Sequence, residues 1–399
     1  MVFNNKPLAT IEERDLQRLI DNQVREGRAI DYKRTLPGGK DLEKKEFLAD
    51  VSSFANASGG YLVFGMDEAE GVATGIKGLV DINVDREILR LDSILQSGLE
   101  PRIPSPEMHI VSLQDGGSVL LMSIRRSWQR PHRVSFQEWG RFFSRNAAGK
   151  FPLSVPELRD LFLRSETIGE HMRAFSRERL NLIIAGDTPV SMPEGAKLVV
   201  HLVPFAAFDV GASIDLAALE QDRRGLNPLG ESGWNKRYNF DGFLTDYTYP
   251  HNGQARSYLQ AFRNGCVEAV QGEQDWERDG QRHFGPEYLH EMLLTNLSRY
   301  IGILQGAGSE CPFAVLISLL GMKGCVMKPR ESVWRYSSYR ESQPIDREVL
   351  ILPEVIIDHS EADLASILRP VFDALWNAAG WRRCMYYDEN GKWLSPSPR

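Results

Sequence analysis

The segment 41–66 constrains the fold more than any other part of the chain. Its apolar residues between Leu48 and Ala55 recur at helical spacing, which predicts a helix with one buried face. Gly59-Gly60 ends that helix, and the apolar run 61–66 that follows is short and rich in strand-forming residues, as expected of a buried strand. A buried helix that leads directly into a buried strand predicts an α+β fold.

The same mixture of helices and strands continues on both sides of this segment. Thr10 and Glu13 have the spacing of a capping box, which predicts the start of a first helix. Further helices are expected near 88–95 and over 155–163, and strands at 29–34, 108–113, 119–124 and 141–144. Because 399 residues exceed the roughly 250–300 that one hydrophobic core normally supports, we expect two domains, residues 1–168 and residues 169–399.

The second domain is also expected to be α+β, and its sequence carries little chemistry. Periodicity predicts helices at 288–303 and 364–378 and strands at 198–202, 240–247, 257–262, 267–270, 313–320 and 349–357. The four cysteines of the chain form no CxxC pair, so no zinc site is expected. The longest apolar run is about half of a membrane span, and the amino end has no signal-peptide run. These features predict a cytoplasmic protein without a membrane segment.

Charge restricts how the protein can contact a polyanion. With 47 Lys and Arg against 54 Asp and Glu, the chain has a net charge of −7, the wrong sign for a protein that coats nucleic acid over its whole surface. Residues 121–150 are the exception, because seven basic side chains there stand against a single acidic one. The basic residues are Arg125, Arg126, Arg130, Arg133, Arg141, Arg145 and Lys150.

Aromatic residues, among them Trp128, alternate with these arginines. Guanidinium groups beside aromatic rings suit phosphate pairing and base stacking, and neutralising about four phosphates would give a slope of log K against log salt near −3 to −4. The alternative is a hairpin with a solvated basic face and a buried aromatic face. Residues 328–340 are a weaker second candidate of similar composition, and there a surface loop without a ligand is favoured.

Acidic residues gather near the start of the chain. Asp31 and Lys33 lie two apart in the expected strand 29–34, so they project from one face of it. Glu26 precedes that strand, from where it can fold onto the same face. The alternative is an ordinary surface ion pair between Asp31 and Lys33, worth less than about 1 kcal/mol.

Asp67 and Glu68 follow the strand 61–66, at a strand end where functional side chains commonly lie. Carboxylates that converge repel one another unless a cation lies between them. Hard oxygen ligands of this kind select Mg²⁺ or Mn²⁺, and such a metal activates water while a nearby lysine such as Lys33 assists. The alternative is that these strand-end acids are simply solvated.

Three stretches of the sequence together resemble the Schlafen AlbA-type (AlbA_2) domain family. They are EGRAIDYK at 26–33, VSSFANASGGYLVFGMDE at 51–68 and RFFSRNAAGK at 141–150. The family carries an acid, four residues, then acid, aromatic and lysine. Later come Ser-x-Phe-Ala-Asn, a Gly-Gly pair, an apolar strand, Gly-x-Asp-Asp and an arginine-bearing strand before a final helix. The resemblance covers about residues 10–165 and implies a mixed sheet with helices.

For this family the resemblance implies nucleic-acid binding and, in some members, metal-dependent cleavage of tRNA or other structured RNA by three carboxylates. Matched residue by residue, those acids fall on Glu26, Asp31 and Glu68, with Asp67 adjacent. Asp31 stands where the family usually has Glu, and Glu68 where it usually has Asp. Animal members use two such lobes in one chain, so a homodimer is expected to supply the second lobe here. No P-loop motif is present, and no organic cofactor is expected.

Three functions are compatible with these patterns. The first is a Mg²⁺- or Mn²⁺-dependent endoribonuclease that acts on tRNA or other structured RNA, in a stress or phage-defence setting. The alternative is a non-catalytic regulatory module that binds DNA or RNA, in which the acids only set local structure. The third is a partner-binding scaffold that uses the aromatic loops of the second domain as its contact surface.

Overall fold

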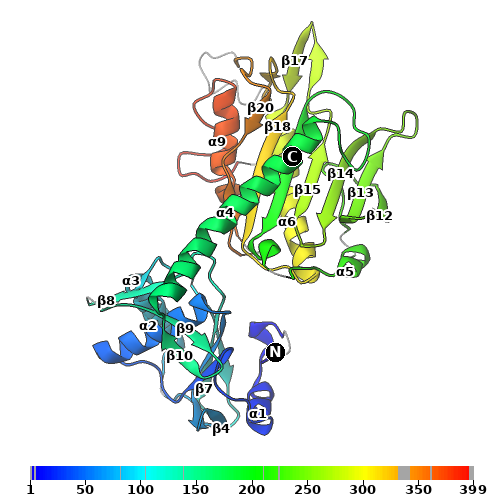
Figure 1. Ribbon diagram of the computed structural model, residues 1–399. Coiled ribbons are helices and arrows are strands. Elements are labelled where there is room, and N and C mark those ends of the chain that lie inside the picture. Colours follow the sequence, from blue (N-terminus) through cyan, green and yellow to red (C-terminus); the bar gives the residue numbers. More distant parts are fainter. Residues whose placement is uncertain are drawn as a thin grey trace. The chain divides into compact units, whose positions relative to one another are not determined.

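The computed structural model describes residues 2–394 except 4–5, 81, 104, 138, 210, 223–224, 331–341 and 360–361, and except the side chains of 164–166. The chain divides into two compact units, Met1–Thr167 and Ile168–Arg399. The boundary falls inside the helix α4 (Val155–Ile184), which is longer than the helix expected from the sequence (Figure 1). Both units mix helices and strands, so the predicted α+β class is confirmed. Most of the second basic candidate, 328–340, lies outside the described residues.

The first unit contains a four-stranded sheet in the order β1-β2-β7-β6. Its strands are β1 (Ile30–Lys33), β2 (Gly60–Phe64), β7 (Ser118–Ile124) and β6 (Glu107–Ser112). Helices α2 (Asp41–Asn56) and α3 (Val84–Gly98) pack on the face that carries Leu62. Helix α1 (Glu13–Asp21) packs on the opposite face, which carries Val63. The alternation of side chains along β2 therefore supplies both halves of the core.

A second sheet of this unit has the order β10-β9-β8-β5. Its strands are β10 (Gly149–Pro152), β9 (Trp139–Asn146), β8 (Arg133–Phe136) and β5 (Leu99–Glu100). A separate hairpin consists of β3 (Met66–Ala69) and β4 (Val72–Ile76). The sequence predicts one strand across 61–66, but Gly65 interrupts it. Its φ of +101° lies in a region that glycine adopts at little cost, and the chain turns there from β2 into β3.

The first helix begins later than the sequence predicts. Thr10 lies in the 3₁₀ turn Leu8–Thr10, where its hydroxyl donates to the carbonyl of Pro7 at 2.8 Å. Glu12 is the N-cap of α1, and the capping box forms between Glu12 and Asp15 instead. The predicted box of Thr10 and Glu13 is wrong because the helix starts at Glu13, so the third helical residue is Asp15.

The second unit is built on an eight-stranded sheet in the order β12-β13-β14-β15-β11-β18-β20, with β21 also paired to β18. The strands are β11 (Lys197–Pro204), β12 (Asn235–Tyr238), β13 (Gly242–Thr248), β14 (Ala255–Phe262), β15 (Val267–Gln271), β18 (Phe313–Leu320), β20 (Val349–Ile351) and β21 (Val355–Ile357). A small sheet contains β16 (Trp276–Arg278), β17 (Gln281–Phe284) and β19 (Val326–Met327).

Helices cover both faces of the large sheet (Figure 1). Helices α6 (Pro286–Gly306) and α9 (Arg369–Ala378) pack on the face that carries Val200, and α4 packs on the face that carries Val199. The short helices are α5 (Leu216–Gln221) and α8 (Leu364–Ile367). No helix of the described chain has both the length and the apolarity needed to cross a membrane.

A buried polar network lies between α4 and this sheet. Glu268 accepts hydrogen bonds from Arg179, at 2.8 and 2.9 Å, and from the hydroxyl of Tyr258 at 2.8 Å. His201 lies 3.2 Å from Glu268 and 2.9 Å from the hydroxyl of Ser176. Burial raises the pKa of Glu268, but Arg179 and His201 outweigh it and lower that pKa to about 2. Glu268 is therefore ionised and fastens the helix to the sheet.

Candidate nucleic-acid interface

Five of the predicted acidic and basic residues meet at one cavity of the first unit, with a volume of about 420 Å³. Glu26 and the β1 residues Asp31 and Lys33 line it together with Arg145 of β9 and Lys150 of β10. The backbone of 147–149, which joins the last two strands, forms part of its wall. Segments far apart in the sequence therefore supply one charged pocket.

The alternation of β1 explains why its two charged residues share the cavity. Ile30 and Tyr32 are buried in the core beneath α1. Asp31 and Lys33 consequently project from the opposite face of the strand. Glu26 is held against this strand, because its N–H donates to the carbonyl of Gly71 at 2.6 Å and its Oε1 accepts from the N–H of Tyr32 at 2.7 Å.

Lys33 lies between two buried carboxylates. Its Nζ is 2.8 Å from Asp31 Oδ1 and 3.3 Å from Asp50 Oδ2. Asp50, on α2, also holds Lys150, whose Nζ is 2.7 Å from Oδ1. The sequence analysis missed Asp50. The only sequence signal for it is its position among the apolar residues 48–55 of the same helix. An acidic residue on the buried face of a helix requires a cationic partner.

The charges of this cavity shift one another's pKa values. Burial raises the pKa of Asp31, but Lys33 and Arg145 outweigh it and hold that pKa below its usual value. Glu26 forms no ion pair among the described residues, and the nearby charge of Lys33 lowers its pKa only in part. Burial and the neighbouring charge of Asp31 raise the pKa of Glu26 to about 7. At neutral pH Asp31 is therefore ionised, whereas Glu26 is close to half protonated.

Arg145 is part of the cavity wall and not of an exposed basic surface. Its side chain is 2% exposed, it pairs with Asp31, and its guanidinium lies 3.9 Å from the ring centroid of Phe54. Its Nε and Nη1 are buried without a hydrogen-bond partner among the described residues. Part of the hydrogen-bonding capacity of this arginine is thus unused.

The other predicted arginines are spread over the second sheet and the loop before it, and many already have partners. Arg125 pairs with Glu107, and Arg133 pairs with Glu100. Arg130 donates to the carbonyl of Ala57, just after α2, at 3.0 Å.

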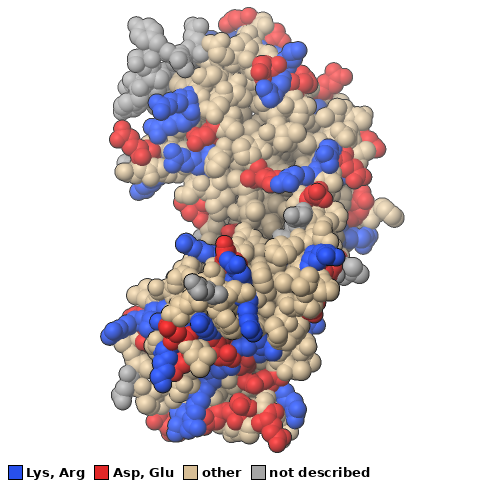
Figure 2. Space-filling view, turned by 60° about the vertical axis from the view of Figure 1, so that its left-hand side comes forward, with Lys and Arg blue, Asp and Glu red and all other residues tan. Residues whose placement is uncertain are grey.

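The rest of this set stacks on aromatic rings. Arg126 lies 4.1 Å from the ring centroid of Trp128, and the exposed Arg141 lies 5.8 Å from that of Trp139. In Figure 2, basic and acidic side chains interleave over the lower part of the view. The basic excess of 121–150 is thus reduced by acids from elsewhere in the chain.

Asp67 and Glu68 lie on the hairpin of β3 and β4. Asp67 is 3.3 Å from the Nε of Arg34, and Glu68 accepts from the N–H of Gly71 at 2.6 Å. From this hairpin, Glu70 and Gly71 line the cavity. The structure thus brings together Glu26, Asp31 and Lys33 but holds Asp67 and Glu68 by other partners. Among the described residues, no group of three His, Cys, Asp or Glu side chains is placed to hold a metal, and the three-carboxylate metal site stays a prediction.

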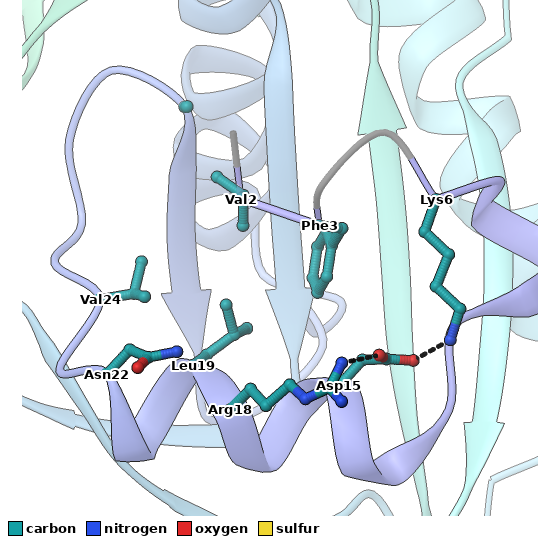
Figure 3. A pocket seen from close by; sticks show the side chains of 9 residues that line it. Val2, Phe3, Lys6, Asp15, Arg18, Leu19, Asn22 and Val24 are labelled. Carbon is teal, nitrogen blue, oxygen red and sulfur yellow. Dashed lines mark hydrogen bonds and ion pairs between the residues drawn. The ribbon is translucent and has the colours of Figure 1, made fainter.

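A larger cavity of about 620 Å³ lies beside α1 (Figure 3). Its apolar wall includes Phe3 and Leu19, and its polar wall is a cluster around Asp15. That carboxylate pairs with Lys6 and, at 3.3 Å, with Arg18, and it accepts from the N–H of Glu12 at 2.9 Å. These contacts tie the amino-terminal segment to α1. Of the described residues in the three stretches that carry the family resemblance, only Ala29 lines this cavity.

The match to a protein-family model supports the family resemblance. Residues 26–154 match the family described as Schlafen, AlbA_2. The N-terminal domain of an ATP-dependent DNA helicase RecG-related protein from Nitrosomonas europaea is 28% identical over 27% of this chain and 71% of that chain, with a TM-score of 0.22. The DIP2311 protein from Corynebacterium diphtheriae is 15% identical over 35% of this chain and 27% of that chain, with a TM-score of 0.24. No curated protein matches the chain. The Schlafen AlbA_2 family, predicted from three sequence motifs, is therefore confirmed for residues 26–154.

Proposed function

We propose that the unit Met1–Thr167 binds nucleic acid at the cavity lined by Lys33, Arg145 and Lys150. The observation that carries this proposal is the convergence of these three cations, from three different strands, on one open cavity. The match of residues 26–154 to the Schlafen AlbA_2 family supports a nucleic-acid partner. Phosphate is the group that such cations bind in a nucleic acid.

The availability of the cations limits the number of phosphates that the site neutralises. Lys33 and Lys150 are 33% and 16% exposed. Arg141, which is exposed on β9 outside the lining of the cavity, is counted as a third available cation. Arg125 and Arg133 are already paired with acids. Three phosphate contacts give a slope of log K against log salt of about −2 to −3. This is less steep than the slope expected from the sequence alone.

Fluorescence anisotropy with labelled tRNA, a hairpin RNA and duplex DNA, between 50 and 200 mM salt, tests the proposal and separates RNA from DNA. Lys33→Met is expected to weaken binding and to reduce the salt slope by about 0.7–0.9. The matched control is Lys77→Met. It removes an exposed lysine that directly follows β4 and does not line the cavity. Equal affinities of both variants and the wild type would refute the cavity as the binding site.

A second candidate is a Mg²⁺- or Mn²⁺-dependent endoribonuclease acting on tRNA or other structured RNA. One observation favours it: burial and the charge of Asp31 raise the pKa of Glu26 to about 7, and a divalent cation can take the place of the proton on Glu26. The fit is incomplete, because Lys33 and Arg145 already pair with Asp31 and Gly71 holds Glu68. Metal ligation by Glu26, Asp31, Glu68 and Asp67 therefore requires these contacts to rearrange.

Incubation of total tRNA with the protein, in Mn²⁺ or in EDTA, separates cleavage from binding. A nuclease is expected to produce fragments only with the metal and to lose this activity in Glu26→Gln and in Glu68→Gln. If tRNA stays intact with every metal but is still bound, the nuclease is excluded and the non-catalytic binding module remains. Light scattering of the same samples, with and without tRNA, tests whether a homodimer supplies a second lobe.

A further inference from the structure

We propose that Asp50 is the positioning residue of the cavity, which holds the ammonium groups of Lys33 and Lys150 where a nucleic-acid phosphate can contact both. This inference rests on the proposed nucleic-acid binding and adds a residue to it. Asp50 lies outside the three sequence stretches that carry the family resemblance, since it immediately precedes the second one.

The geometry assigns one carboxylate oxygen to each ammonium group. Oδ2 of Asp50 is 3.3 Å from Lys33 Nζ, and Oδ1 is 2.7 Å from Lys150 Nζ. The side chain of Asp50 is 4% exposed, so water does not compete effectively for it. A single group on α2 thus fixes the cation of β1 relative to the cation of β10.

The other partners of the two lysines do not replace this link. Lys33 also contacts Asp31 at 2.8 Å, on its own strand. Lys150 also contacts Glu46 at 2.6 Å, but that carboxylate is 61% exposed. Each of these acids holds one lysine only. Lysine side chains carry up to about 2 kcal/mol of rotamer entropy, and without Asp50 nothing in the described chain joins the two ammonium groups.

Two effects of Asp50 on a bound polyanion have opposite signs. As a negative charge at the cavity, Asp50 repels phosphate, so its removal should tighten binding. As the anchor of two cations, it preorganises them, so its removal should weaken binding. The isosteric substitution Asp50→Asn removes the charge and therefore distinguishes the two roles by the direction of the change.

The experiment measures nucleic-acid affinity and its salt dependence for the full chain with Asp50→Asn. Positioning predicts at least a five-fold loss of affinity at 100 mM salt and a slope reduced by about 0.7–0.9, equivalent to one lost phosphate contact. The matched control is Glu43→Gln, which removes one negative charge from the same helix outside the cavity and is expected to bind at least as tightly as the wild type. Unchanged or tighter binding by Asp50→Asn would overturn the inference.

A coupling measurement separates positioning from a loss of fold. In Lys33→Met/Lys150→Met, Asp50 has no ammonium group left to position, so adding Asp50→Asn to that double variant should change the affinity no further. A further loss equal to that in the wild-type background would contradict the inference. Circular dichroism identifies any variant that does not fold. If Asp50→Asn alone does not fold, the affinity of the triple variant, which lacks all three charges, is compared with that of Lys33→Met/Lys150→Met, and a lower affinity of the triple variant would contradict the inference. If the wild type binds no nucleic acid, the proposed function itself fails, which is a separate outcome.

Discussion

The pH dependence of unfolding should be dominated in the second unit by His290 of α6. Its side chain is fully buried, and its ring centroid lies 4.1 Å from that of Phe372, 5.6 Å from Trp393 and 6.0 Å from Tyr386. Neither ring nitrogen has a hydrogen-bond partner among the described residues. Burial therefore lowers the pKa of His290 to about 3.

The sign and size of the effect follow from this pKa. The unfolded chain binds a proton at this histidine with a pKa near 6.5, so its contribution to stability is fully present above about pH 6.5 and is lost as the pH falls toward 3. At pH 5 the loss is about 2 kcal/mol, and at pH 3 it is about 4 kcal/mol. Replacement by a residue that does not titrate should remove this slope.

Urea unfolding at several pH values measures the effect in the wild type and in His290→Leu. The buried Trp376 contacts His290, so the tryptophan emission transition includes the unfolding of this unit. The free energy of unfolding of the wild type minus that of His290→Leu should fall by about 2 kcal/mol between pH 8 and pH 5. The exposed His251 provides the control substitution. A difference that does not vary with pH would refute a neutral, desolvated His290.

Three further predictions concern the first unit and the buried network. Nucleic-acid affinity should fall as the pH rises through about 7, because ionised Glu26 repels phosphate, and binding isotherms of Glu26→Gln should lack that step. Glu268→Gln should cost about 3 kcal/mol in urea unfolding, because it removes the buried charge that pairs with the partly exposed Arg179. Removal of Arg173, an exposed partner of Glu354, should cost less than about 1 kcal/mol. Asn56→Ala should lower the free energy of unfolding by at least about 2 kcal/mol, because the buried amide bonds the backbone of His132 and Phe143; a thermal midpoint equal to that of the wild type would contradict this.

Local sequence signals predicted the long helices and the central strands but missed short strands such as β8, β10 and β12. The helical spacing of 48–55 and the Gly-Gly pair placed α2 and β2, since a buried face and a left-handed turn leave clear residue patterns. The prediction of strand boundaries was wrong where one apolar run contributes to two strands. Gly65 divides the apolar run 61–66 between two sheets, and an apolar run alone does not reveal which sheet it joins.

The candidate site was predictable in part. The period of two in β1 put Asp31 and Lys33 on one face, and the structure has them there. The position of Glu68 depends on the hairpin of β3 and β4, which the sequence did not reveal, and its assignment as a metal ligand is untested. Asp50 was missed because the residues that neutralise it, Lys33 and Lys150, are far from it in the chain. Long-range charge pairing leaves no periodic signal.

The arrangement of the cavity requires two residues of helix α2 to lie on the same side of the helix. Asp50, which holds the two lysines, and Phe54, on which Arg145 lies, are four residues apart, and residues at that spacing lie one above the other on a helix. Inserting or deleting one residue between them would rotate one relative to the other by about 100°. Such a change would separate the lysine pair from the arginine while leaving every charged side chain in the sequence. The cavity therefore depends on the register of a helix as much as on the residues that line it.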